Sequence, residues 1–74
     1  MITLNFKKGC IYKRTHNDGV VIFKFIRRKN NKSFIEGEIL YSSISYLHVG
    51  EIIQLIYYGT FREISNDEWM AIAL

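Results

Sequence analysis

The segment between residues 18 and 40 constrains the fold of this 74-residue chain more than any other feature. A run of β-branched and aromatic residues, Val20 to Ile26, lies between the pairs Asp18-Gly19 and Asn30-Asn31. Both pairs suit tight turns, because Asp, Asn and Gly tolerate positive φ, and runs of this composition favour strands. The sequence therefore predicts two consecutive β-hairpins, with strands near residues 10–15, 20–26 and 33–40.

The second turn also predicts a register. If Asn30-Asn31 is the loop tip, Ile26 lies opposite Ile35 and Ile22 lies opposite Ile39. Alternate strand residues point to opposite faces, so these four isoleucines are expected to share the core face. A one-residue slip or a bulge would exchange the faces. The opposite face would carry aromatic and charged side chains together: Phe23, Phe25, Arg27, Phe34, Glu36 and Glu38.

The region after the second hairpin is less regular. Residues 41–50 have no clear period and contain three serines, which is typical of a crossing loop or a short helical turn closing one end of a barrel. Glu51 to Tyr58 alternates weakly and is almost wholly apolar, which is expected of a strand that is buried on both sides or covered on one side by another element. Gly59-Thr60 then leads into a short strand at residues 61–64.

The C-terminal segment predicts a short helix. Ser65-Asn66-Asp67-Glu68 has the form of a capping box, with two acids in the first turn, where the helix dipole favours negative charge. The helix is expected to run from Asn66 to about Ala73. Its docking stripe would be Trp69, Ile72 and Ala73, which recur at helical spacing.

Together these elements predict a mostly β fold: a small five-stranded antiparallel barrel, SH3-like or OB-like, with a short C-terminal helix. Residues 1–74 are expected to form one small β-barrel domain, because a chain of this length has room for one core. An apolar fraction of 49% is too high for a disordered chain. The resemblance is one of architecture, since no RNP strand signature, Walker loop or Sm-like glycine pattern is present.

Charge is divided sharply along the chain. Nine of the ten basic residues lie in residues 1–32 with a single acid, Asp18, so this block carries +8. Six of the seven acids lie after Ser33 with a single cation, Arg62, so the second block carries −5. A positive block of this density favours a polyanion or an acidic protein surface as partner. Opposite poles also allow the chain to form a homo-oligomer, head to tail.

The candidate site is a basic hairpin that contacts phosphates. Arginine forks suit phosphate oxygens, and a projecting hairpin tip can enter a groove or follow a nucleic-acid backbone. An equally weighted alternative is that these cations only solubilise strand ends and guard sheet edges. The predicted nucleic-acid-binding residues, which Lys7 and Lys8 extend, are Lys13, Arg14, Lys24, Arg27, Arg28, Lys29, Lys32 and Phe34.

Aromatic residues near this charge would add stacking for unpaired bases. Tyr12, Phe23, Phe25 or Phe34 would serve if exposed, each contributing roughly 1–3 kcal/mol. Other tyrosines, at positions 41, 46, 57 and 58, are expected to pack in the core and at the barrel ends. The alternative for them is a protein interface, where tyrosine is enriched.

Catalysis and metal binding are disfavoured, so we expect a non-enzymatic protein without cofactor. No two metal ligands have the close spacing typical of zinc sites. Cys10, His16 and Asp18 could be imagined as nucleophile, base and orienting acid, but a buried structural thiol is the favoured interpretation. The carboxylates of Glu36 and Glu38 are explained by pairing with Arg27 and by exposure.

Several features bear on location and origin. One cysteine forms no internal disulfide, and the sequence shows no leader with a cleavage site, so a reducing cytoplasm is expected. The longest uncharged run, residues 39–50, is too short and polar to span a membrane. Lys, Asn, Ile, Tyr and Phe supply 33 of 74 residues, and their A/T-rich codons suggest a low-GC bacterium, phage or mobile element.

The sequence thus leads to two hypotheses. The first is a non-enzymatic nucleic-acid-binding barrel that uses its basic hairpin on phosphates. The alternative is a protein-binding module, an inhibitor or adaptor encoded by a phage or mobile element, that uses the same surface or its tyrosines. Salt dependence separates them, because phosphate binding releases counterions whereas a protein interface depends on a few central anchors.

Overall fold

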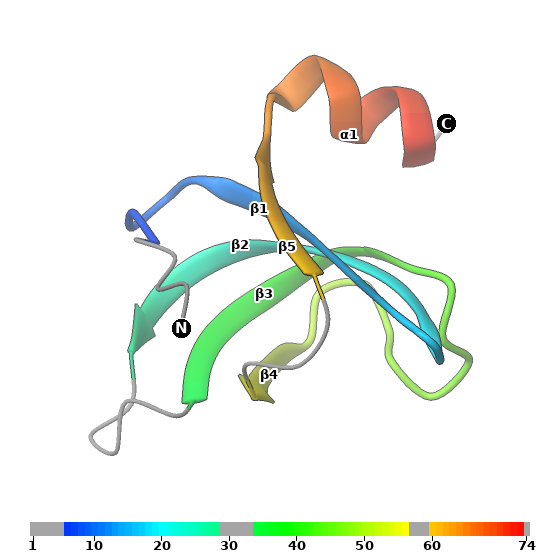
Figure 1. Cartoon of the computed structure of the whole chain (residues 1–74), viewed down its shortest axis with the longest axis horizontal. Coiled ribbons are helices and arrows are strands. Elements are labelled where there is room, and N and C mark those ends of the chain that lie inside the picture. Colours follow the sequence, from blue (N-terminus) through cyan, green and yellow to red (C-terminus); the bar gives the residue numbers. More distant parts are fainter. Residues whose placement is uncertain (1–5, 29–33, 57–59, 74) are drawn as a thin grey trace.

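The computed structural model describes residues 6–28, 34–56 and 60–73 (Figure 1). Its elements are β1 (Ile11–His16), β2 (Gly19–Arg28), β3 (Phe34–Ser42), β4 (Ile52–Ile56), β5 (Thr60–Ile64) and α1 (Asn66–Ala73). All five strands join one antiparallel sheet in the order β4-β3-β2-β1-β5. The mostly β fold with a short C-terminal helix is confirmed. Within the described residues the curved sheet is not closed between β4 and β5, so the predicted barrel is not confirmed.

The first hairpin follows the turn signal in the sequence. His16 pairs with Gly19, so that Asn17 and Asp18 form the two-residue loop between β1 and β2. Gly19 has a φ of 139°, which side-chain-bearing residues rarely adopt. A Cβ atom at Gly19 would also lie 2.6 Å from Oγ of Ser43. Glycine is therefore required both by the backbone and by the close approach of the loop after β3.

The second hairpin forms, but its predicted register is wrong. Ile35 lies opposite Arg28 and Ile39 lies opposite Phe23, whereas Ile26 and Ile22 were expected there. The pairing shifts twice, which leaves Leu40 of β3 and Ile26 of β2 as extra residues in β-bulges. Each bulge changes which residues face the core. The predicted loop tip at residues 30 and 31 lies outside the described residues.

The bulges put aromatic residues in the main core. Phe23 and Phe25, which were expected on the opposite face, are buried there together with Ile35 and Ile39, whereas Ile22 belongs to a separate cluster. Aromatic rings bury more area than isoleucine, which favours this choice of face. The buried members of the main core are Tyr12, Val21, Phe23, Phe25, Ile35, Ile39 and Ile44.

A smaller cluster on the other face anchors the helix. Ile11, Ile22 and Ile64 are buried there, and Trp69 of α1 packs against them as a half-buried side chain. The predicted cap is confirmed, because Oγ of Ser65 accepts a hydrogen bond from the N–H of Glu68 at 3.1 Å. The predicted docking stripe is only partly correct. Its other two members, on the last turn of α1, remain exposed.

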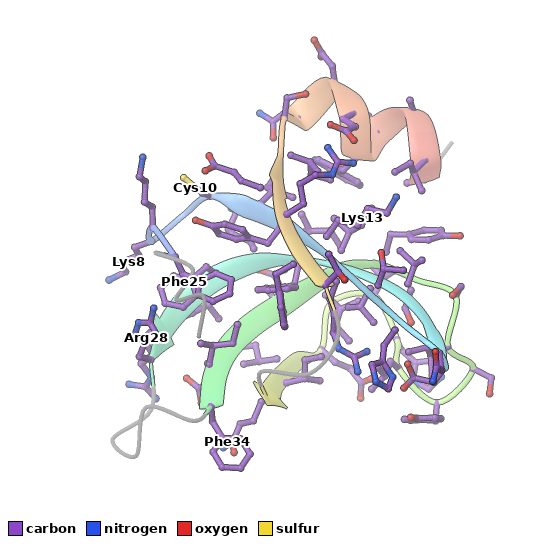
Figure 2. All side chains as sticks on the ribbon, in the orientation of Figure 1. Lys8, Cys10, Lys13, Phe25, Arg28 and Phe34 are labelled. Atoms are coloured by element: carbon purple, nitrogen blue, oxygen red, sulfur yellow. The ribbon has the colours of Figure 1, made fainter. Side chains whose placement is uncertain are left out.

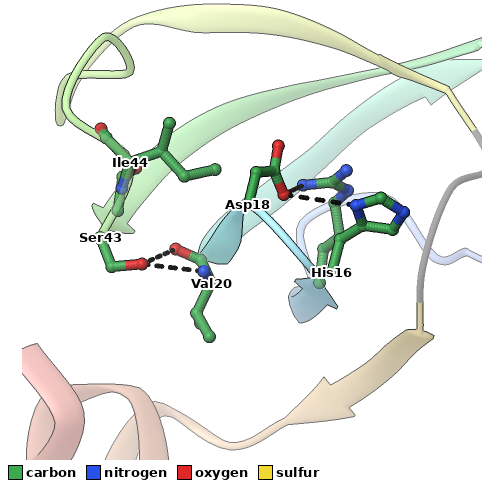
Figure 3. Close-up of polar contacts among 7 residues, drawn as sticks. His16, Asp18, Val20, Ser43 and Ile44 are labelled. Carbon is green, nitrogen blue, oxygen red and sulfur yellow. Dashed lines mark hydrogen bonds and ion pairs between the residues drawn. The ribbon is translucent and has the colours of Figure 1, made fainter.

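The loop between β3 and β4 packs against the main core. It inserts Ile44, which is buried, and Leu47, which is partly buried. Ser43 connects this loop to the start of β2. The N–H of Val20 donates to Oγ of Ser43 at 2.9 Å (Figure 3). The N–H of Ser43 donates to the carbonyl of Val20 at 2.9 Å. A loop was expected here and is present, but the barrel end that it was expected to close is not confirmed.

β4 is not buried on both sides, which was one of the two environments expected for it. Ile53 packs against the main core, but Ile52 is 64% exposed and Gln54 is also exposed. The strand therefore has one covered face and one open face. Its short length and its position at the edge of the sheet explain this exposure, because no second sheet or helix of the described residues covers it.

Candidate nucleic-acid interface

A tight turn brings Lys7 and Lys8 to the end of the sheet. The N–H of Cys10 donates to the carbonyl of Lys7 at 3.1 Å, and Gly9 adopts a φ of 84°. The chain then pairs with β2: the N–H of Gly9 donates to the carbonyl of Phe25, and the N–H of Phe25 donates to the carbonyl of Cys10. The two lysines thus lie beside the last residues of β2, 17 or more positions away in sequence.

The last residues of β2 add two arginines. Arg27 and Arg28 are exposed, and the guanidinium carbon of Arg28 lies 5.6 Å from the ring centroid of Phe6. This cation–π contact joins the end of β2 to the segment that leads into the lysine turn. We call the surface formed by Lys7, Lys8, Arg27 and Arg28 the basic end. Figure 2 shows Lys8 and Arg28 at the same end of the sheet.

The basic end keeps most of its charge exposed to solvent. Nε of Arg27 donates to Oε1 of Glu36 at 2.6 Å, yet the Arg27 side chain remains 67% exposed. Glu36, by contrast, is only 14% exposed, so the free side of the Arg27 guanidinium faces solvent. Lys7 and Lys8 are exposed as well. The surface can therefore offer several N–H donors and a positive potential to an anionic partner.

The aromatic residues at this end hold the fold together and are not free to stack on bases. Phe6 stacks on Phe25 with ring centroids 5.3 Å apart and meets Tyr12 edge-to-face at 4.7 Å. Tyr12, Phe23 and Phe25 are all buried. These three side chains therefore do not provide the stacking surface that exposure would have allowed.

Phe34 is the predicted aromatic that stays accessible. It is half-buried at the first position of β3, beside Ile35, which pairs with Arg28. Figure 2 places its ring at the same end of the sheet as Arg28, pointing away from the core. A base stacked on this ring would lie near the basic end.

Two of the predicted cations lie on the helix-bearing face instead. Lys13 follows the buried Tyr12 and points to the opposite side, near Glu68 of α1 (Figure 2). Lys24 lies opposite Glu38 in the pairing of β2 with β3. Both lysines therefore have acidic neighbours and lie apart from the basic end.

Arg14 is buried. Its side chain is 8% exposed, and its Nη1 lies 3.4 Å from Oδ1 of Asp18 at the turn between β1 and β2. The same oxygen lies 3.5 Å from Nδ1 of His16 (Figure 3). Arg14 thus stabilises this hairpin end and is not placed to contact a large ligand.

The structure therefore divides the predicted set. It brings Arg27, Arg28 and Phe34 to one end, places Lys13, Lys24 and Arg14 elsewhere, and leaves Lys29 and Lys32 outside the described residues. Lys7 and Lys8 were only an extension of the prediction, yet they belong to the site. No short sequence pattern links Lys7 and Lys8 to Arg27, because backbone pairing between segments distant in sequence brings them together.

The imagined catalytic group does not assemble. Cys10 precedes β1 and His16 ends it, so they are separated by about 20 Å of extended strand. Cys10 is a free, half-buried thiol that packs against the main core. Among the described residues, no group of three or more histidine, cysteine, aspartate or glutamate side chains could hold a metal ion.

Comparisons of the chain with known families, curated proteins and solved structures found no significant match. In the part of the chain that the structure describes, α1 is the only helix, and its eight residues are too few to cross a bilayer. The site must therefore be judged by its own chemistry.

Proposed function

We propose that this protein is a non-enzymatic nucleic-acid-binding module whose basic end contacts phosphates. One observation carries the proposal: backbone bonds of Gly9 and Cys10 to Phe25 bring residues 7–8 and 27–28, which are distant in sequence, to one end of the sheet, so that four cations lie there. Glu36 bonds to this group through Arg27. Phosphate contacts of lysine and arginine supply most of the affinity of such binding.

The proposal also accounts for the separation of charge. Lys29 and Lys32, in the adjoining loop sequence, would add to the same positive field. Apart from Glu36 and Glu38 in β3, the acids lie elsewhere, at the turn after β1, before β4, in β5 and in the first turn of α1. A phosphate backbone would be drawn to one end of the molecule and repelled from the other, which orients the encounter. Phe34 would add contact with unpaired bases.

For the architecture we infer an open SH3-like barrel and disfavour the OB-like one. The support is topological: β1 to β4 form an uninterrupted meander, and β5 returns to the free side of β1. The OB-fold is a Greek-key arrangement. The opening lies between β4 and β5.

The experiment is a salt titration of binding, with fluorescence anisotropy of labelled duplex and single-stranded oligonucleotides. If about four phosphates are contacted, log affinity should fall against log salt with a slope of roughly −3 to −4. The test variant is Lys7→Glu/Lys8→Glu, because both side chains are exposed. We expect it to flatten the slope and weaken binding at least tenfold at low salt.

A matched control changes the same amount of charge on the other face. Lys13→Glu/Lys24→Glu alters net charge equally but lies on the helix-bearing face. It should weaken binding much less than the first pair. Equal losses from the two pairs would show that only net charge matters, and no binding of the wild type at low salt would refute the proposal.

A second candidate is a protein-binding module, such as an inhibitor or adaptor of a phage or mobile element. The exposed apolar side chains of Tyr46 and Val49, 67% and 69% exposed, favour it. A pull-down from a low-GC bacterial lysate with and without nuclease separates the two. Nuclease-resistant capture of one protein, lost in Tyr46→Ser/Val49→Ser, would support this candidate over the first.

A further inference from the structure

One side of β4 faces no other strand of the described residues. Among the strands that the structure describes, β4 pairs only with β3. The N–H of Ile39 donates to the carbonyl of Glu51 at 2.9 Å and the carbonyl of Ile39 accepts from the N–H of Gly50 at 2.9 Å, so Ile39 occupies a hydrogen-bonded position opposite the start of β4. Because bonded and non-bonded pairs alternate in antiparallel sheets, Ile53 and Leu55 bond to β3. The N–H and C=O groups of Ile52, Gln54 and Ile56 therefore point to the open edge.

This edge lacks the usual protection against strand pairing. Natural sheets guard their edges with charges, prolines, bulges or covering elements. Ile52–Ile56 contains no charged residue and no proline. The opposite edge differs, because β5 carries Arg62 and Glu63, both exposed. Only the β4 edge is suited in composition to accept a further strand.

The approach to the β4 edge is also apolar. Ile52 is 64% exposed, and Tyr46 and Val49 in the loop before β4 are exposed to a similar degree. A turn in which the N–H of Glu51 donates to the carbonyl of His48 connects this segment directly to the strand. Removing these side chains from water would add hydrophobic free energy to backbone pairing.

We propose that two copies of this chain pair through their β4 strands, antiparallel, about a two-fold axis at Gln54. In a two-fold interface, residue i of one copy contacts residue j of the other and j contacts i, so the strand must be compatible with its own reverse. In Ile-Ile-Gln-Leu-Ile, Gln54 of one copy would face Gln54 of the other, Ile52 would face Ile56, and Ile53 would face Leu55, so that each apolar position meets an apolar position. The backbone groups that point to the edge are those this pairing uses.

Charge favours a second copy in this orientation. Ile56 pairs with Phe34, so it lies toward the basic end, whereas Glu51 immediately precedes Ile52. Antiparallel pairing sets Ile56 of one copy beside Ile52 of the other. The two basic ends are therefore kept apart, and each lies on the side where the other copy carries Glu51. Like-charge repulsion does not oppose the dimer.

The test is the mass of nucleic-acid-free protein by sedimentation equilibrium, from about 10 μM to about 1 mM. The wild type should rise from the monomer mass of 8.8 kDa toward twice that value. Gln54→Pro should remain monomeric, because proline removes an outward N–H but none that bonds to β3. Gln54→Ala keeps this N–H and should still form the dimer.

A second pair of variants decides the question if Gln54→Pro does not fold. Ile52→Lys places a charge on the proposed edge and should weaken the dimer at least tenfold, whereas Thr60→Lys, on the β5 edge, should not. The proposal is overturned if the wild type stays monomeric throughout, or if Ile52→Lys forms the dimer as well as Thr60→Lys does. A dimer lost at about 0.5 M salt would indicate head-to-tail charge pairing and overturn it too.

Discussion

The ring of Phe23 packs directly on the backbone of Gly37 in the neighbouring strand. A Cβ atom at position 37 would lie 2.5 Å from Cδ2 of Phe23 and 3.2 Å from the carbonyl oxygen of Lys24. Gly37 is buried in the middle of β3, where a glycine by itself weakens a strand. Here the aromatic ring covers the exposed backbone and fills the space that a side chain would take.

We therefore expect Gly37→Ala to destabilise the protein by about 1–3 kcal/mol, as overpacked cores do. Chemical denaturation measures the change. Phe23→Leu frees space beside Gly37, so the double variant should be more stable than the sum of the two single losses predicts. Strict additivity would show that the ring does not set the requirement for glycine.

Trp69 is the side chain that holds α1 to the sheet. It is half-buried against Ile11, Ile22 and Ile64, and no residue of α1 is fully buried. Trp69→Ala should therefore cost about 2 kcal/mol, less than the 3–5 kcal/mol of a fully buried aromatic. Hydrogen exchange should accelerate selectively in residues 66–73. Trp69→Phe serves as the control, and uniform acceleration across the sheet would contradict the prediction.

The ion pair between Arg62 and Glu68 should make the stability of the fold depend on pH in the acidic range. Nη2 of Arg62 lies 2.5 Å from Oε2 of Glu68, and this hydrogen bond lowers the pKa of the Glu68 carboxyl below its usual 4.5. Because the pKa of Glu68 is lower in the folded state than in the unfolded state, the ion pair adds its full stability at pH values above the unfolded-state pKa. This stability is lost as pH falls through the folded-state pKa. Glu68→Gln should reduce the drop in melting temperature between pH 7 and about pH 3.

Arg62→Gln provides the matched test of that pair. It removes the partner of Glu68 and should reduce the acid dependence to the same extent. The double variant should behave like either single variant. A further reduction in the double variant would mean that the two side chains act separately.

Tyr12 should make the unfolding free energy depend on pH in the alkaline range. Burial raises the pKa of its hydroxyl above the usual 10.0, and the hydrogen bond from the Lys7 N–H opposes this only in part. A raised pKa in the folded state means that stability is complete below pH 10 and is lost as pH rises through the raised value. The decline in unfolding free energy above pH 10 should therefore be smaller in Tyr12→Phe.

The same variant has a cost at neutral pH. Oη of Tyr12 accepts the hydrogen bond of the Lys7 N–H at 2.7 Å, and phenylalanine leaves this donor without it. We expect a loss of about 1 kcal/mol in denaturant unfolding. Phe61→Leu, which alters a neighbouring aromatic without a hydroxyl, should leave the alkaline dependence intact.

Local chemistry made most of the elements predictable. Asp18-Gly19 marked the first hairpin, and Ser65 with Glu68 marked the start of α1. These signals act within a few residues, so the sequence displays them directly. The candidate site was predictable only in part, because a dense run of cations around Arg27 and Arg28 is visible in the sequence while its neighbours in space are not.

The register of β2 with β3 was not predictable. Apolar residues occupy both faces of β2, so periodicity alone does not show which face packs in the larger core. Phe23 lies on that face, and Ile22 lies on the other. The bulges at Ile26 and Leu40 decide this, because each moves the following residues to the other face. Bulges arise from the packing of several strands together, which no local pattern encodes.

The sequence by itself determined the element types, the two hairpins, the helix cap and the two blocks of charge, because each depends on backbone preferences or composition over short stretches. Only the tertiary structure decided which cations share a surface. Backbone bonds between Gly9, Cys10 and Phe25 bring Lys7 and Lys8 to Arg27 and Arg28, while Asp18 holds Arg14 at the other end. Such placement depends on contacts between residues far apart in the chain, and these form only when the sheet assembles.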